Sequence, residues 1–232
     1  FMTLQAISKG FKYYKNFGLD FSIKIIPLVF LFGFIASNVS TSQISMGLSN
    51  IDILLLLFNN FLISPFITIF SILLANDLFK NDKRDVLVYY AISWQFLIKV
   101  LLLSLISTIA IGLGLVLFVF PGILIAGVLI FVNYYAILEN KSIFESLYLS
   151  WESSKLNLVQ CILMATFFWL ITILSITILS SLVSNYEKPD DISQIYRILS
   201  SSIAIYIQIC LISFPILAFY QSQLLNKVKN ST

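Results

Sequence analysis

Histidine is missing from this chain of 232 residues, and charged residues make up only 11% of it. The lack of histidine excludes a His-ligated zinc site, a haem with an axial histidine and a Ser-His-Asp triad. Only two cysteines are present, Cys161 and Cys210, and both lie inside apolar runs. Their wide spacing suits neither a disulfide framework nor a CxxC metal or redox site, so we interpret both as small buried hydrophobic residues. No cofactor is expected.

Other signatures of catalysis are also missing. The chain lacks the GxxxxGK[ST] motif, and Gly112 and Gly114 lie within an apolar run instead of opening a phosphate loop. No nucleophile stands beside a base and no pair of acids lies within an apolar run, so the sequence predicts no enzyme. No nucleic-acid partner is expected either. The first seventeen residues are polar and basic on one side, which predicts that no cleaved signal peptide begins here.

Hydrophobic residues, in contrast, make up 59% of the chain, and the mean hydropathy is +0.97. Values so far from those of soluble domains indicate an integral membrane protein. A spanning helix needs about 20 apolar residues, so the chain has room for six spans and no separate soluble domain. We therefore predict an all-α, polytopic protein with one membrane domain over residues 1–232. The predicted spans are about 21–38, 54–76, 96–116, 120–138, 157–182 and 197–220, with a tight hairpin at Pro121-Gly122 between the third and the fourth.

The distribution of Lys and Arg predicts the orientation of these spans. Ten of the fourteen basic residues lie on one side of the predicted membrane, and only Lys188 and Arg197 lie on the other. The positive-inside rule therefore places both termini in the cytoplasm. The ten residues are Lys9, Lys12, Lys15, Lys80, Lys83, Arg84, Lys141, Lys155, Lys227 and Lys229.

Three half-polar segments, about 3–17, 84–95 and 142–155, each precede a pair of spans. Segment 3–17 places lysines on one half of a helix and apolar residues on the other, which suits a helix on an anionic leaflet. We expect all three to be cytoplasmic interfacial helices. Segment 84–95 is apolar nearly all round, so the alternative for it is partial burial by the bundle. The chain would then repeat one unit three times, an interfacial helix followed by a transmembrane hairpin. The alternative to a repeat is chance similarity in a sequence rich in Leu, Ile, Ser and Phe.

Segment 142–155 has a characteristic pattern. At 100° per residue, one apolar arc holds Ile143, Phe144, Leu147, Tyr148 and Trp151. Ser153 falls on the exposed polar face with the glutamates. Ser146 and Ser150 form a narrow seam of small residues beside the arc. Such a seam lets helices approach closely, so it packs on the protein's own bundle or, alternatively, receives a partner or a lipid headgroup.

The stretch FPGILIAGVLIFVNYYAILENKSIFESLYLSWESSKLN resembles the YciC-like inner-membrane proteins of Gram-negative bacteria. It also resembles the related membrane domain of glycerophosphoryl diester phosphodiesterases. The shared pattern is a Pro-Gly, an apolar span, an acidic residue, a short segment with a repeated serine, and then a basic residue and an asparagine. These family-motif positions are Pro121, Gly122, Glu139, Ser146, Ser150, Lys155 and Asn157.

The resemblance implies a multi-pass protein of the bacterial inner membrane whose family has no established biochemical activity. It supplies no catalytic residue. The phosphodiesterase relatives carry out hydrolysis in a separate soluble barrel, so the resemblance of the membrane domain does not imply their enzyme activity.

Few polar residues lie within the predicted spans, and they are the candidates for an intramembrane site. Lys24 and Lys99 each lie about four residues into a span, where snorkelling to the cytoplasmic interface is favoured over a functional charge. Asp20 lies one turn before Lys24 and could pair with it. The deeper candidates are Asn59, Asn60 and Asn133. For these we favour interhelical hydrogen bonds over contacts with a substrate.

Taken together, these features predict a non-enzymatic inner-membrane protein that supports the envelope by binding lipid or a partner protein of the membrane or envelope. The alternative is a transporter or a lipid-translocating protein that uses the space between the hairpins. A polar cavity open to the membrane would favour this alternative, whereas a dry bundle with a broad apolar flank would favour partner binding.

Overall fold

The computed structural model describes residues 2–40, 50–82, 84–184 and 191–231, and these contain only helices and their connections. Lys83 and Lys188, two of the basic residues used to predict the orientation, lie outside the described residues. The helices are α1 (Met2–Ser40), α2 (Asn50–Phe58), η1 (Asn59–Ile63), α3 (Ser64–Lys80), α4 (Val86–Leu117), α5 (Val119–Val128), α6 (Val132–Leu138), α7 (Ile143–Leu156), α8 (Leu158–Ser184), α9 (Asp191–Ile205), η2 (Tyr206–Leu211) and α10 (Ile212–Ser231). The segments η1 and η2 are π-helical.

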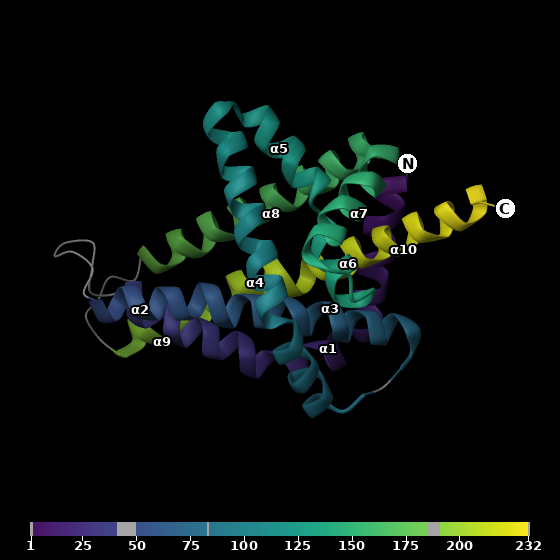
Figure 1. Cartoon of the computed structure of the whole chain (residues 1–232). Helices are drawn as coiled ribbons and strands as arrows, with labels where there is room; N and C mark the ends of the chain where they lie inside the picture. The colour runs from purple at the N-terminus through teal and green to yellow at the C-terminus, as the bar shows by residue number, and fades with distance from the viewer. Residues whose placement is uncertain (1, 41–49, 83, 185–190, 232) are drawn as a thin grey trace.

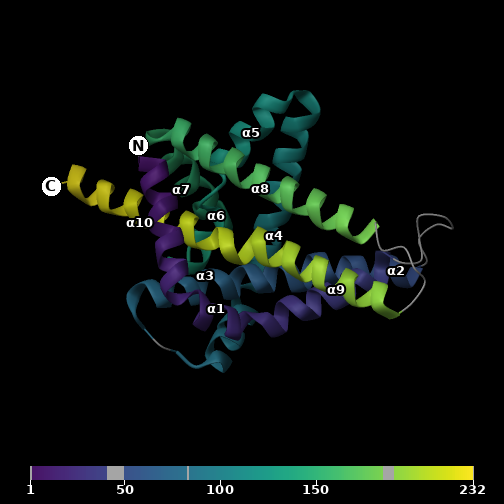
Figure 2. The same ribbon diagram turned by 180° about the vertical axis from the view of Figure 1, so that it is seen from behind.

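Six stretches within the described residues are long and apolar enough to cross a membrane, which confirms the predicted all-α polytopic fold. They are Leu4–Asn38, Ile53–Lys80, Val86–Leu117, Val119–Leu138, Leu158–Leu179 and Gln194–Leu224. The protein is therefore a multi-pass integral membrane protein. Figures 1 and 2 show that the C-terminal ends of α1 and α8 lie at one end of the molecule, and both chain termini lie toward the other.

The three half-polar segments differ in structure. Segment 3–17 is the first part of the long helix α1, and segment 84–95 falls largely within the first part of α4. Neither segment is separated from the span that follows it, because the helix continues without interruption. A continuous helix keeps its backbone N–H groups paired where no water is present. In Figures 1 and 2 the first part of α1 nevertheless runs in a different direction from the rest of that helix. Only segment 142–155 corresponds to a separate helix, α7.

The apolar half of segment 3–17 does not lie free for a membrane surface, contrary to expectation. Ala6 and Gly10 are buried, and the ring of Tyr14 packs on Phe214 of α10. A Cβ at Gly10 would collide with the backbone of Pro215, so the two helices cross at very close range. Part of the apolar half is therefore covered by the bundle itself.

The centre of the molecule is α3, which packs against α1, α4, α6 and α10. Every residue from Ile69 to Leu78 is buried, including a side chain with a formal charge, Asp77. Phe21 and Phe214 meet edge to face beside this helix, with ring centroids 4.8 Å apart. The core is thus continuous across the first, second and last spans.

The second and sixth spans share one irregularity. A π-helical segment precedes a proline in each: η1 precedes Pro65, and η2 precedes Pro215. Proline lacks the N–H that would bond four residues back, and a locally widened helix is a common response to that loss. The fourth span is interrupted instead, between α5 and α6. The threefold repeat remains a prediction that this similarity favours without establishing.

The hairpin between α4 and α5 turns at Phe118, three residues before the predicted Pro121-Gly122. Pro121 instead lies in the first turn of α5, where a missing N–H costs nothing because no carbonyl precedes it in the helix. Gly114 and Gly122 bring the two arms together, since a Cβ on Gly114 would lie 2.8 Å from the Cα of Gly122. In Figure 1 the tip of this hairpin extends beyond the other helices, while α5 packs on α8.

Candidate functional site

The family-motif residues converge on α7, which begins with a complete capping box. The hydroxyl of Ser142 accepts from the backbone N–H of Glu145, and the carboxylate of Glu145 accepts from the backbone N–H of Ser142. This second hydrogen bond holds the pKa of the Glu145 carboxyl below its usual range. The box gives α7 a defined start immediately after the connection from α6.

Four serines form the buried face of α7, and each is fully shielded from solvent. They are Ser146, Ser150, Ser153 and Ser154. The hydroxyl of Ser150 donates to the carbonyl of Val128 at 2.7 Å, and that of Ser154 donates to the same carbonyl at 3.1 Å. Val128 is the last residue of α5, where helix carbonyls lack an intrahelical partner. The serine seam therefore docks α7 on the protein's own bundle by capping α5, and this agrees with the first of the two readings of the seam.

Ser153 was expected on the exposed polar face, and this expectation is wrong. Its hydroxyl is buried and hydrogen-bonded to the hydroxyl of Tyr135 on α6. Hydrogen bonding to α5 and α6 sets the buried face of α7, whereas the helical-angle argument assigned faces by hydrophobicity alone. Polar hydroxyls consequently point inward and large aromatics point outward.

Two further motif residues, Glu139 and Asn157, connect the ends of α6 and α7 with α10. Glu139, just after α6, accepts a hydrogen bond from the hydroxyl of Tyr220. Asn157, between α7 and α8, donates to Gln223 at 2.8 Å. The motif pattern thus describes a structural junction in this chain, in which Glu139, Ser150 and Asn157 each bond to another helix. Ser146 and Lys155 instead contact Ser142 and Trp151 of their own segment.

The outward face of α7 consists of Phe144, Tyr148 and Trp151, which are 81%, 64% and 45% exposed. Lys155 extends over the Trp151 ring, with its Nζ 5.2 Å from the ring centroid. Two other apolar residues of the helix, Ile143 and Leu147, pack beside a small buried cluster on α4 and α6. The predicted apolar arc is therefore divided, with its aromatic part facing away from the protein.

Both intramembrane lysines have partners at their own end of the span. Lys24 pairs with Asp20 at 3.4 Å, as the one-turn spacing indicated. The Nζ of Lys99 donates to Asn140 Oδ1 at 2.9 Å and lies 5.0 Å above the ring of Phe96. Because Asn140 belongs to the connection between α6 and α7, Lys99 reaches along its helix toward that connection, as a snorkelling side chain does.

The three asparagines have different environments. Asn59 is buried and donates to the carbonyl of Phe32 on α1 at 3.4 Å, the kind of interhelical bond that was expected. Asn60 instead donates to Leu56 on its own helix at 2.9 Å. The side-chain oxygen of Asn133 is buried without a hydrogen-bond partner among the described residues. The structure does not bring these asparagines together into one site.

A groove of about 340 Å³ lies between the second span and α4. Five of its nine lining residues carry a hydroxyl or an amide, and none is charged. The polar ones are Asn60, Ser64, Thr68, Ser104 and Thr108, and the others are Phe61, Pro65, Leu101 and Leu105. Sequence reasoning identified Asn60 alone. The four-residue spacing of the others was a usable indication, because residues four apart share a helix face.

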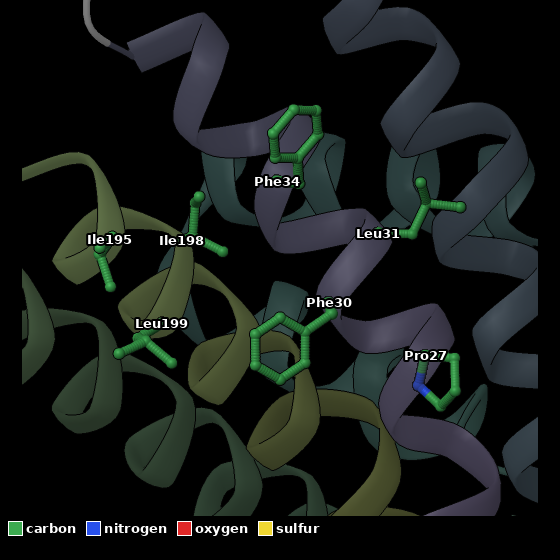
Figure 3. A pocket seen from close by; sticks show the side chains of 7 residues that line it. All are labelled: Pro27, Phe30, Leu31, Phe34, Ile195, Ile198 and Leu199. Atoms are coloured by element: carbon green, nitrogen blue, oxygen red, sulfur yellow. The ribbon is translucent and has the colours of Figure 1, made fainter. Parts of the chain in front are cut away.

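A second groove, of about 480 Å³, lies between α1 and α9 and is wholly apolar. Figure 3 shows Phe30 and Phe34 of α1 on one side and Ile195, Ile198 and Leu199 of α9 on the other. It offers no hydrogen-bonding side chain with which to distinguish one apolar molecule from another.

Asp77 is a further buried polar residue that sequence reasoning missed. It is 1% exposed, accepts from the Tyr89 hydroxyl at 2.9 Å and pairs with the Arg84 guanidinium at 3.1 Å. This cluster closes the turn between α3 and α4. It therefore has a structural explanation.

Among the residues that the structure describes, no three His, Cys, Asp or Glu side chains are placed to hold a metal ion. Cys161 and Cys210 are both buried, as expected. Comparisons of the chain with protein-family models, with curated proteins and with solved structures found no significant match.

Proposed function

We propose that this integral membrane protein is a non-enzymatic component of a bacterial inner membrane that supports the envelope by binding lipid or a partner protein at its cytoplasmic side. The observation that carries the proposal is the division of α7 into a docked serine face and an outward aromatic face. Large aromatic side chains gain little by standing in water, so this face has an apolar or interfacial neighbour.

Lipid is the favoured neighbour because of the charges beside the aromatic face. Lys155 lies over Trp151, and Lys141 precedes the helix by two residues. Aromatic rings at the acyl boundary with lysines at the headgroup level are typical of helices on an anionic leaflet. The exposed Lys9, Lys12 and Lys15 on the first part of α1 add positive charge to the side that the positive-inside rule assigns to the cytoplasm.

Purification in mild detergent, followed by mass spectrometry of the lipids and proteins that co-purify, tests this proposal. The informative variant replaces Phe144, Tyr148 and Trp151 with Gln, and Glu152→Gln on the same helix is the matched control. We expect the triple variant to lose co-purifying anionic lipid while the control retains it. Loss of a protein instead of lipid would identify the partner-binding form of the function. Unchanged lipid and protein in the triple variant would contradict the proposal.

The alternative function, transport or lipid translocation, is favoured by the polar groove between the second span and α4. An uncharged polar groove at membrane depth is unusual in a bundle that only needs to pack. Reconstituted vesicles that carry a fluorescent phospholipid test this alternative, because translocation exposes inner-leaflet lipid to a quencher added outside. We expect scrambling only if the groove opens to both leaflets.

A further inference from the structure

We propose that the groove between the second span and α4 binds a neutral lipid whose headgroup carries a free hydroxyl and ester groups, such as a diacylglycerol. The inference rests on the lipid-binding function proposed above and names a second lipid class at a separate site. It is carried by the hydrogen-bonding groups of the groove, by its backbone and by its depth.

The hydrogen-bonding groups of the groove are only partly used within the protein. The Thr68 hydroxyl donates to the carbonyl of Ser64 at 3.0 Å, and the Asn60 amide donates to its own helix. Within the described residues, the hydroxyls of Ser64, Ser104 and Thr108 have no hydrogen-bond partner. Hydroxyls at membrane depth gain from a partner because no bulk water is present there. A ligand with its own hydroxyl and carbonyl groups would supply both acceptors and donors.

The backbone beside these side chains is also irregular. Phe61 lies within the π-helical segment η1, and Pro65 follows four residues later, so the Phe61 carbonyl cannot receive the usual α-helical N–H. Both residues line the groove. Single π-helical turns inside helices are frequent at functional sites. The Phe61 carbonyl is therefore placed where a ligand in the groove could donate a hydrogen bond to it.

The depth and charge of the groove determine the class of ligand. Asn60, Ser64 and Thr68 lie in the interior of the span Ile53–Lys80, and Ser104 and Thr108 lie in the interior of the span Val86–Leu117. No Lys, Arg, Asp or Glu lines the groove, so a phosphate or an ammonium bound there would remain unpaired at membrane depth. A neutral headgroup avoids that cost. The absence of charge therefore favours a diacylglycerol over a phospholipid.

The size of the groove fits the headgroup region of such a lipid. Its volume of about 340 Å³ lies at the small end of the range for ligand pockets, too small to enclose two acyl chains. Phe61 and Leu105 are 41% and 40% exposed at its margin, so acyl chains leaving the groove would meet apolar side chains and then the bilayer. The groove between α1 and α9 lacks these polar groups and cannot select a headgroup.

Photo-crosslinking in nanodiscs of phosphatidylethanolamine and phosphatidylglycerol tests the inference. The probe is a diacylglycerol with a diazirine and an alkyne in one acyl chain, and a phosphatidylglycerol with the same chain is the matched probe. The variant Ser104→Ala with Thr108→Val removes two free hydroxyls at small change in volume. Ser107→Ala, on the same helix and outside the groove, is the control. Thermal unfolding establishes that each variant is folded.

We expect saturable labelling of peptides from α3 and α4 by the diacylglycerol probe, displaced by unlabelled diacylglycerol. The double variant should weaken it roughly tenfold, as expected for two lost neutral hydrogen bonds, and Ser107→Ala should not. Equal labelling of the groove by the phosphatidylglycerol probe would overturn the neutral-lipid class. No saturable labelling, or labelling unchanged in the double variant, would overturn the site.

Failure of this inference is distinguishable from failure of the proposed function. If co-purification of anionic lipid still requires the aromatic face of α7 while the groove is not labelled, the groove inference alone is wrong. If the groove is labelled while the α7 variant retains all its lipid, the role of α7 is wrong and the groove remains a lipid site.

Discussion

Small hydroxyl side chains have an internal role in this protein that their polarity does not suggest. Ser150 and Ser154 of α7 are buried where they donate to the last carbonyls of α5, and a serine hydroxyl is short enough to reach them while the helices stay close. Exposure of the neighbouring aromatics follows from the same contact. At the scale of the residue, hydrogen bonding outweighs hydrophobicity in orienting α7.

Replacing Ser150 with Leu should therefore destabilise the protein. The larger side chain removes the hydrogen bond to Val128 and overfills a fully buried contact, at a cost of about 1–3 kcal/mol. Thermal unfolding in detergent, together with the yield of folded protein from membranes, measures the effect. Glu152→Gln, on the exposed side of the same helix, should leave both unchanged. An unaltered unfolding temperature for Ser150→Leu would mean that α7 is not docked through its serines.

The helical elements show which features sequence reasoning can reach. Six apolar helices were predicted and six are found among the described residues, because each is a long apolar run and hydropathy reports such runs directly. The positions at which helices begin, continue or turn were predicted less well. Segments 3–17 and 84–95 looked like separate helices, but the decision to continue or break a helix depends on whether the bundle buries the segment, as it does at Gly10. The predicted hairpin turn lies three residues too late, because the first turn of a helix tolerates a proline such as Pro121.

Two glycines near the C-terminal end of α4 provide a matched test of the α4–α5 hairpin. Gly114→Ala should destabilise the protein by about 1–3 kcal/mol, because the new Cβ would meet the backbone of Gly122 at 2.8 Å. Gly112→Ala meets nothing within 4 Å and should be neutral, or stabilising by up to about 1 kcal/mol through helix propensity. Unfolding temperatures of the two variants make the comparison. Equal effects would show that the hairpin arms do not approach at Gly114.

The whole molecule combines a buried junction at the ends of α6 and α7 with a polar groove at membrane depth. The resemblance motif located the junction, and the structure gives a contact to each of its polar residues. The groove could not be identified from the sequence, because its polar residues come from two spans and the facing of those spans depends on the packing of α3. The buried ion pair of Asp77 was also not predicted, because its partner Arg84 lies on the far side of a turn and the two meet only in the folded chain.

The predicted orientation has a direct test. A cysteine introduced at Asn185, which lies outside the described residues, should react with an impermeant thiol reagent added to intact cells. A reporter fused at the C-terminus should be active in the cytoplasm. The wild-type chain is the control, because its own Cys161 and Cys210 are buried and should react little. Labelling at position 185 only after lysis would reverse the orientation.

The contact between the aromatic face of α7 and lipid is tested most directly by the fluorescence of Trp151. The chain has three tryptophans, so Trp94→Phe with Trp169→Phe leaves Trp151 as the single emitter. In nanodiscs, we predict strong quenching by phospholipid brominated near the ester end of its acyl chain. Phospholipid brominated near the methyl end should quench weakly, and acrylamide in the water should have little effect, because an interfacial ring lies at the acyl boundary. Strong acrylamide quenching with no effect of either brominated lipid would place Trp151 in water and contradict the account.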